Sequence, residues 1–179
     1  MLQKSSMQLV LDLFFISPTK EYTLKEISTL IKLAHTSVKR NLLMLVKQGL
    51  IMMQVQKKGN RSFPSYKAKM ENPLFKKYKK IANLQHLLES GLVEFLEENI
   101  MPKSIVLFGS YSRGEDIESS DIDIFIEGIE EKLNLTFFEK KLKKKIELHY
   151  KKDFISYPNE LKNNIINGIV LYGFLEGYD

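Results

Sequence analysis

Two short apolar runs separated by a polar segment constrain the fold of this chain most. The first run, Ile105 to Phe108, is followed by Gly109-Ser110. The second, Ile122 to Ile126, begins within Asp121-Ile122-Asp123, so that two aspartates stand at alternate positions. Runs of this length and composition predict β-strands. Residues two apart in a strand point to the same face, so Asp121 and Asp123 should present their carboxylates side by side, roughly 7 Å apart at the backbone. The sequence therefore predicts a small sheet with an acidic pair on one face.

Paired carboxylates of this kind predict a divalent-metal site. Hard cations such as Mg²⁺ or Mn²⁺ prefer carboxylate ligands together with substrate phosphate oxygens, and two ions about 4 Å apart can hold both oxygens of a phosphoryl displacement. A third carboxylate is expected from a neighbouring strand, where Glu147 is the best placed and Asp153 is held in reserve. Because the chain has no cysteine, any metal must be bound by oxygen or imidazole ligands.

The turn after the first predicted strand is suited to binding phosphate. Gly109 lets the backbone approach a triphosphate closely, and successive N–H groups with the hydroxyl of Ser110 can bind its oxygens. Arg113 adds a charged group for the same phosphates. Together with the aspartates, these residues predict in-line attack on the α-phosphate of a nucleoside triphosphate, with pyrophosphate as the leaving group.

The complete pattern resembles the nucleotidyltransferase superfamily that includes DNA polymerase β, and is most similar to its minimal nucleotidyltransferase (MNT) branch. That branch commonly reads Gly-Ser-x-Ala-Arg-Gly and then Ser-Asp-x-Asp; this chain has Gly109-Ser110-Tyr111-Ser112-Arg113-Gly114 and Ser120-Asp121-Ile122-Asp123. Two positions depart from the pattern: Ser112 replaces alanine, and Glu147 stands where the family usually carries aspartate. The resemblance covers roughly residues 103–172.

The resemblance implies an activity, cofactors and partners. Relatives in this branch transfer adenylate to hydroxyls of proteins or small molecules, which implies ATP or another nucleoside triphosphate as substrate and Mg²⁺ or Mn²⁺ as cofactor. Several relatives act as antitoxins of the HEPN toxin family, which implies a toxin-type protein partner. The expected catalytic and metal-binding residues are Asp121, Asp123 and Glu147, and the expected nucleotide-binding residues are Gly109, Ser110, Arg113 and Ser120.

The N-terminal part of the chain predicts a second fold. Apolar periodicity predicts three helices, over about residues 7–15, 23–31 and 36–48, and two β-type runs follow at 51–56 and 61–66. Thr23 and Glu26 have the spacing of a capping box at the start of the second helix. Helices followed by a hairpin are the order of a winged helix-turn-helix, and residues 36–51 resemble the recognition-helix region of bacterial and archaeal winged-helix regulators.

The third predicted helix and the hairpin tip are expected to contact DNA. With Val38, Leu42 and Leu45 turned to the core, polar residues near the start of this helix remain for base edges and phosphates. The candidate DNA-binding residues are Thr36, Ser37, Lys39 and Arg40 on the helix and Lys57, Lys58 and Arg61 at the wing. A winged helix used for dimerisation or protein docking is the open alternative.

The charge distribution favours a polyanionic partner for the N-terminal part. Residues 1–80 contain 16 Lys and Arg against 4 Asp and Glu, a balance of +12, whereas residues 81–179 contain 11 against 18, a balance of −7. A basic half is typical of nucleic-acid binding. Lysine that serves only for solubility would give the same excess.

The sequence assigns no binding or catalytic site to the histidines or to the run of lysines. His35, His86 and His149 lack metal-ligand spacing, which predicts surface or packing roles. His149 is set apart because it lies two positions after Glu147, on the same face of a predicted strand. The lysines at 140, 141 and 143–145 predict a solvated helix face, with guidance of a nucleotide or anionic partner as the alternative.

These patterns predict an α+β protein. Its parts are a winged helix-turn-helix (1–69), a connecting helix (70–101) and a nucleotidyltransferase-type α/β domain with a small mixed sheet (102–179). Without a membrane-length apolar run or a signal-peptide pattern, a cytoplasmic location and a homodimer typical of operator-binding winged helices are expected. Two functions remain open: a metal-dependent transferase with a DNA-binding module, or a transcriptional regulator or antitoxin whose transferase domain senses nucleotide or docks a partner without turnover.

Overall fold

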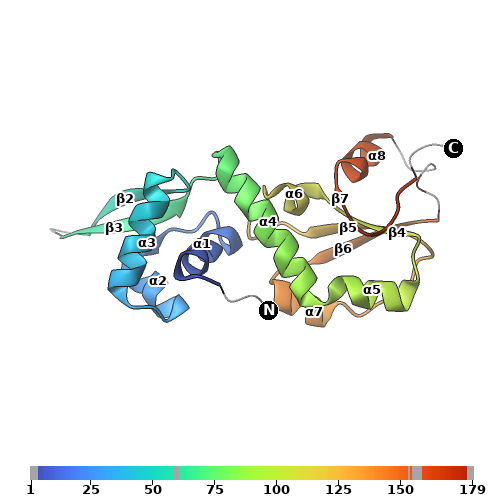
Figure 1. Cartoon of the computed structure of the whole chain (residues 1–179), viewed down its shortest axis with the longest axis horizontal. Helices are drawn as coiled ribbons and strands as arrows, with labels where there is room; N and C mark the ends of the chain where they lie inside the picture. Colours follow the sequence, from blue (N-terminus) through green and yellow to red (C-terminus); the bar gives the residue numbers. More distant parts are fainter. Residues whose placement is uncertain (1–3, 59–60, 153, 155–158, 177–179) are drawn as a thin grey trace. The chain divides into compact units, whose positions relative to one another are not determined.

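The structure is a computed structural model that describes residues 4–58, 61–152, 154 and 159–176 (Figure 1). The chain divides into two compact units, Met1–Lys79 and Lys80–Asp179. In the described part of the chain, no helix has the length and apolar character needed to cross a membrane.

The N-terminal unit combines helices with a small antiparallel sheet. Its elements are α1 (Ser6–Ile16), β1 (Tyr22–Thr23), α2 (Leu24–Ile31), α3 (His35–Lys47), β2 (Ile51–Lys58) and β3 (Arg61–Ala68), with strand order β1-β3-β2. The predicted helices and hairpin are confirmed. Strand β1 was not predicted, and the hairpin strands are longer than expected, so that Lys57 and Lys58 belong to β2 rather than to the turn.

Local capping explains where α1 and α2 begin. The capping box predicted at Thr23 is present: the Thr23 hydroxyl accepts from the Glu26 N–H, and the Glu26 carboxylate accepts from the Thr23 N–H at 2.7 Å. A second capping box, not predicted, joins Ser5 and Gln8 at the start of α1. These side chains satisfy backbone donors that the first turn of a helix leaves without partners.

The C-terminal unit contains a mixed four-stranded sheet, as predicted. The remaining elements are α4 (Pro73–Ser90), α5 (Leu92–Ile100), β4 (Ser104–Phe108), α6 (Gly109–Arg113), β5 (Ile122–Glu127), α7 (Thr136–Leu142), β6 (Ile146–Lys151), α8 (Asn159–Ile166) and β7 (Ile169–Gly173), and the division between the units falls within α4. The strand order is β6-β5-β4-β7, with β5 and β6 parallel and the other pairs antiparallel.

Alternate residues of the central strands face different layers. Ile122, Ile124 and Ile126 of β5 join a buried cluster with apolar residues of α4, α5 and α7. Phe125, between them in sequence, belongs to a second cluster that includes Ile165 of α8. Figure 1 shows α5 and α8 on different sides of this sheet. Odd-numbered positions of β5 and β6 therefore lie on the α8 side of the sheet, and Asp123, Glu147 and His149 are among them.

Candidate active site

Strands β5 and β6 bring two of the predicted acidic residues together. The strands are parallel, and Asp123 is the register partner of Glu147. The Asp123 side chain is 26% exposed and the Glu147 side chain 57% exposed. The pair is therefore open to solvent on one side, as a site for a soluble substrate requires.

His149 completes a group of three donors with this pair. Its Nε2 atom lies 3.5 Å from Oδ1 of Asp123 and 3.9 Å from Oε2 of Glu147. One donor atom from each of the three residues lies within 4.8 Å of the others. Among the residues that the structure describes, this Nε2 atom is buried and has no hydrogen-bond partner. Sequence reasoning gave His149 no role, although its position two residues after Glu147 carried the signal.

Gly109 is required by the position of the Asp123 carboxylate. Phe108, at the end of β4, is the register partner of Asp123, and Gly109 follows with φ +72°. A Cβ atom at Gly109 would lie only 2.1 Å from Oδ2 of Asp123. Glycine alone combines this backbone conformation with the space that the carboxylate occupies.

The phosphate-binding residues predicted after this glycine lie on a short helix, not in a loop. Helix α6 begins at Gly109 and carries Ser110 and Arg113. Arg113 Nε donates to Oε2 of Glu115 at 2.9 Å, and its side chain is 49% exposed. Because exposed ion pairs are weak, this pairing leaves Arg113 available to a stronger anion such as a phosphate.

Asp121 is placed differently from Asp123. Strand β5 begins at Ile122, so Asp121 lies just before the strand rather than within it. It is not a member of the group formed by Asp123, Glu147 and His149. The neighbouring Ser120 hydroxyl accepts from the Ile117 N–H at 3.0 Å, which holds the preceding loop. Both residues line a cavity instead.

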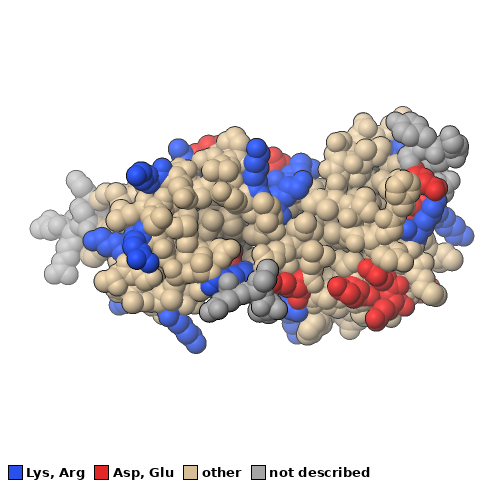
Figure 2. Space-filling model, in the orientation of Figure 1, with Lys and Arg blue, Asp and Glu red and all other residues tan. Residues whose placement is uncertain are grey.

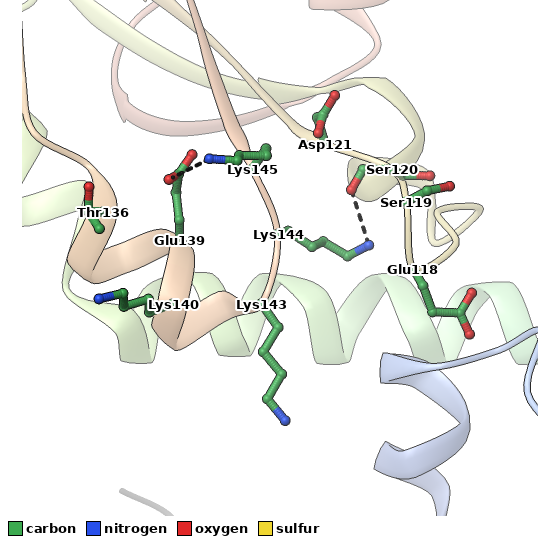
Figure 3. Close-up of a pocket in the computed structure, with 10 residues that line it drawn as sticks. All are labelled: Glu118, Ser119, Ser120, Asp121, Thr136, Glu139, Lys140, Lys143, Lys144 and Lys145. Atoms are coloured by element: carbon green, nitrogen blue, oxygen red, sulfur yellow. Dashed lines mark hydrogen bonds and ion pairs between the residues drawn. The ribbon is translucent and has the colours of Figure 1, made fainter.

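This cavity has a volume of about 430 Å³ and a basic wall (Figure 3). Figure 3 shows the Lys145 amine directed at Glu139 and the Lys144 amine directed at Ser120, whereas the amines of Lys140 and Lys143 point away from the other residues drawn. The lysine run thus does more than form a solvated helix face. The lining residues are Glu118, Ser119, Ser120, Asp121, Thr136, Glu139, Lys140, Lys143, Lys144 and Lys145.

A buried polar network fixes the loop that leads into β5. Lys144 Nζ lies 3.1 Å from Oδ2 of Asp116, with side chains 7% and 1% exposed. The same amine donates to the carbonyls of Ile117 and Ser120, and Asn83 Nδ2 donates to Oδ1 of Asp116 at 2.7 Å. Burial, and then the Asp116 carboxylate, raise the pKa of Tyr111. Sequence reasoning missed this network because its members are far apart in the chain.

The donor set fits a divalent cation. Ligand atoms around one ion with bonds of 2.0–2.2 Å are about 3 to 4.4 Å apart. The separations from His149 Nε2 to the two carboxylates, 3.5 and 3.9 Å, fall in that range. The buried Nε2 atom makes no hydrogen bond within the described residues, and the missing side chain at Gly109 gives the Asp123 carboxylate the space that it occupies in this group.

The predicted DNA-binding residues lie on the N-terminal unit. Thr36, Lys39 and Arg40 are exposed and Ser37 is half-buried near the start of α3, while Val38, Leu42 and Leu45 are buried. Lys57 and Lys58 lie in β2 and Arg61 in β3, and their side chains are outside the described part of the structure. On the face drawn in Figure 2, Lys and Arg are spread over the N-terminal unit, and the largest group of Asp and Glu lies on the C-terminal one.

A family model matches the C-terminal unit. Residues 91–174 match the family model "Polymerase beta, Nucleotidyltransferase". A solved structure, the "Possible transcriptional regulator from Methanosarcina mazei Go1", is 18% identical and covers 54% of this chain and 79% of its own, with a TM-score of 0.38. This structural likeness is too weak to support an inference.

Curated relatives come from Methanocaldococcus jannaschii. "Putative protein adenylyltransferase MJ1215" is 46% identical over 61 residues, which are 34% of this chain and 70% of that protein. Two further proteins with the same description, MJ0128 and MJ1379, are 50% and 56% identical over 26% and 19% of this chain. The chain spans only 47% and 34% of their lengths. With its family-model match and its identity to MJ1215, the chain belongs to the polymerase beta nucleotidyltransferase family.

Proposed function

We propose that this nucleotidyltransferase transfers a nucleoside monophosphate, AMP from ATP, to a hydroxyl group on a protein or small molecule. The observation that carries the proposal is the placement of Asp123 beside both Glu147 and Gly109. The names of the relatives support adenylate as the transferred group and a protein as the acceptor.

Each residue of the site has a part in this reaction. Asp121, Asp123 and Glu147 would hold Mg²⁺ or Mn²⁺, which when bound offsets negative charge on the reacting phosphate. The backbone of Gly109 and the hydroxyl of Ser110 bind the triphosphate, and Arg113 turns from Glu115 to the same phosphates. Ser120 acts on the nucleotide indirectly, since its hydroxyl holds the loop before Asp121. The cavity next to Asp121 receives the remainder of a substrate.

Calorimetric titration of nucleoside triphosphates tests the nucleotide site. With Mg²⁺ present, we expect the wild-type protein to bind ATP, and the Asp121→Asn/Asp123→Asn protein to bind it at least about tenfold more weakly, because two metal-binding charges are lost. Glu98→Gln, an exposed carboxylate of α5, is the matched control and should bind ATP like the wild type. Failure of the wild-type protein to bind any triphosphate would contradict the proposal.

We further propose that the N-terminal unit is a winged helix-turn-helix that binds DNA. Helix α3 exposes Lys39 and Arg40 while burying Val38 and Leu42, so its polar side is available to a partner. The hairpin of β2 and β3 follows it, as a wing follows a recognition helix. The charge balance of +12 over residues 1–80 favours phosphate contacts.

Charge reversal on α3 tests the DNA proposal. Lys39→Glu/Arg40→Glu should weaken DNA binding at least about tenfold. The salt dependence of the affinity should fall by the amount expected when about two phosphate contacts are lost. The charge-matched control is Lys132→Glu/Lys152→Glu, which changes two exposed lysines of the C-terminal unit and should leave DNA affinity within about twofold. Unchanged affinity in the α3 variant, measured by fluorescence anisotropy, would instead favour a dimerisation or protein-docking role.

A regulator or antitoxin without turnover is the second candidate. It is favoured by the position of Asp121, which lies outside the donor group, so that among the described residues, which do not include Asp153, two carboxylates converge. In this case the C-terminal unit senses a nucleotide or docks a toxin-type protein, and the N-terminal unit, as a homodimer, binds an operator. The two candidates differ in whether label from ATP is transferred.

A further inference from the structure

We propose that His149 is a protein ligand of the metal ion, so that the site selects Mn²⁺ over Mg²⁺. The inference rests on the metal site of the proposed function and adds a nitrogen ligand to its carboxylates. It replaces the sequence-based expectation of a surface or packing role for this histidine.

The position of the imidazole favours coordination over packing. A histidine on the surface exposes its ring nitrogens to water, whereas Nε2 of His149 is buried and lacks a hydrogen-bond partner among the described residues. The ring lies with its centroid 5.1 Å from that of Phe108, in an edge-to-face arrangement. This contact fixes the ring plane and leaves Nε2 directed at Asp123 and Glu147. A buried nitrogen that makes no hydrogen bond costs free energy that a metal ion bound between it and the two carboxylates can restore.

The strand geometry supplies both residues to one ion. Glu147 and His149 are two positions apart on β6, so their side chains leave the same face of the strand. Asp123 lies opposite Glu147 on the neighbouring strand. Strands β5 and β6 therefore contribute two carboxylates and one imidazole to the site, in addition to Asp121 just before β5.

The chemistry of the donors determines which ion is preferred. Mg²⁺ favours oxygen ligands and retains its water molecules, whereas imidazole nitrogen is a good ligand for first-row transition ions. A site with one nitrogen donor should therefore bind Mn²⁺ more tightly than Mg²⁺. The ratio of the two affinities should be larger than in a site with oxygen donors alone.

Pulsed electron paramagnetic resonance of bound Mn²⁺ tests the inference directly. The full-length protein is loaded with Mn²⁺ and a non-hydrolysable ATP analogue whose nitrogens are ¹⁵N. We expect a ¹⁴N coupling typical of a coordinated imidazole, lost in His149→Gln. In the same variant Mn²⁺ affinity should fall about tenfold or more, while Mg²⁺ affinity changes less than about threefold. His149→Asp, with an oxygen donor, should retain metal binding and lose most of the preference for Mn²⁺.

The controls separate the failure of this inference from the failure of the proposed function. His35→Ala removes an exposed histidine of α3 and should leave the ¹⁴N coupling unchanged. Mn²⁺ binding that is lost in Asp123→Asn, with no ¹⁴N coupling in the wild type, would overturn the role of His149 and leave the carboxylate site intact. Mn²⁺ binding that persists unchanged in Asp123→Asn, or no binding by the wild type, would overturn both.

Discussion

Asp123→Asn should lower the rate of nucleotide transfer by about 10³-fold or more. The substitution keeps the shape of the Asp123 side chain, which fits against Gly109. It removes the carboxylate charge that, together with Glu147, would hold a cation. Loss of several kcal/mol of charge stabilisation at a reacting phosphate corresponds to a rate effect of this size. The measurement is transfer of label from ATP labelled at the α-phosphate to protein or to a small-molecule acceptor.

Two controls make this result specific to the proposed chemistry. ATP labelled at the γ-phosphate should leave the acceptor unlabelled, because the label departs with pyrophosphate. Glu98→Gln should transfer label at the wild-type rate, and Asp123→Asn should retain DNA affinity, since its change lies in the other unit. Transfer by Asp123→Asn at the original rate would exclude this carboxylate from the reaction. No transfer by the wild type would favour the regulator or antitoxin.

Lys144→Met should destabilise the C-terminal unit by about 3–5 kcal/mol. The substitution removes the buried amine that lies 3.1 Å from the Asp116 carboxylate, which is 1% exposed. Removing one partner of a buried ion pair costs this much because the remaining charge is desolvated. It also removes the donor to the carbonyls of Ile117 and Ser120. For a unit of this size the loss should lower the unfolding temperature by more than about 10 °C in circular dichroism.

Lys145→Met is the matched control for this prediction. Lys145 is the next residue, and its ion pair with Glu139 at 3.2 Å involves a lysine side chain that is 76% exposed. Surface pairs of this kind contribute at most about 1 kcal/mol. Equal effects of the two substitutions would show that the buried network is not what stabilises the loop before β5. The Lys144→Met/Asp116→Leu protein should recover part of the stability, since both charges of this buried pair are removed together.

The sequence predicted the longer helices and strands, and the alternation of side-chain direction along the strands of the candidate site. Alternation along β6 was sufficient to place Glu147 and His149 on one face, because side-chain direction in a strand depends only on position. The register that sets Asp123 opposite Glu147 became visible only in the sheet. The capping box at Thr23 was equally local and is present. Features that depend on a few neighbouring residues were therefore accessible without a structure.

Short helices and strands, and contacts between residues distant in the sequence, could not be predicted from the sequence. Helix α6 has too few residues for periodicity to be detected, and β1 is shorter still. The sequence predicted one connecting helix over residues 70–101, but Gly91, in a left-handed conformation with φ +82°, separates α4 from α5. The position of Asp121 outside the donor group depends on where pairing of β5 begins, and the buried Lys144–Asp116 pair joins distant segments.

The connection between the parallel strands β5 and β6 can vary in sequence without altering the strands that carry the candidate site. Asp123, Glu147 and His149 belong to β5 and β6, whereas much of the cavity wall comes from α7 and the segment that leads into β6. A parallel pair requires such a crossover, and its length and composition are weakly constrained by the sheet. Mutation in residues 136–145 can thus reshape the cavity while the proposed metal ligands stay in register, so that on the proposed function acceptor choice can diverge among relatives faster than the reaction itself.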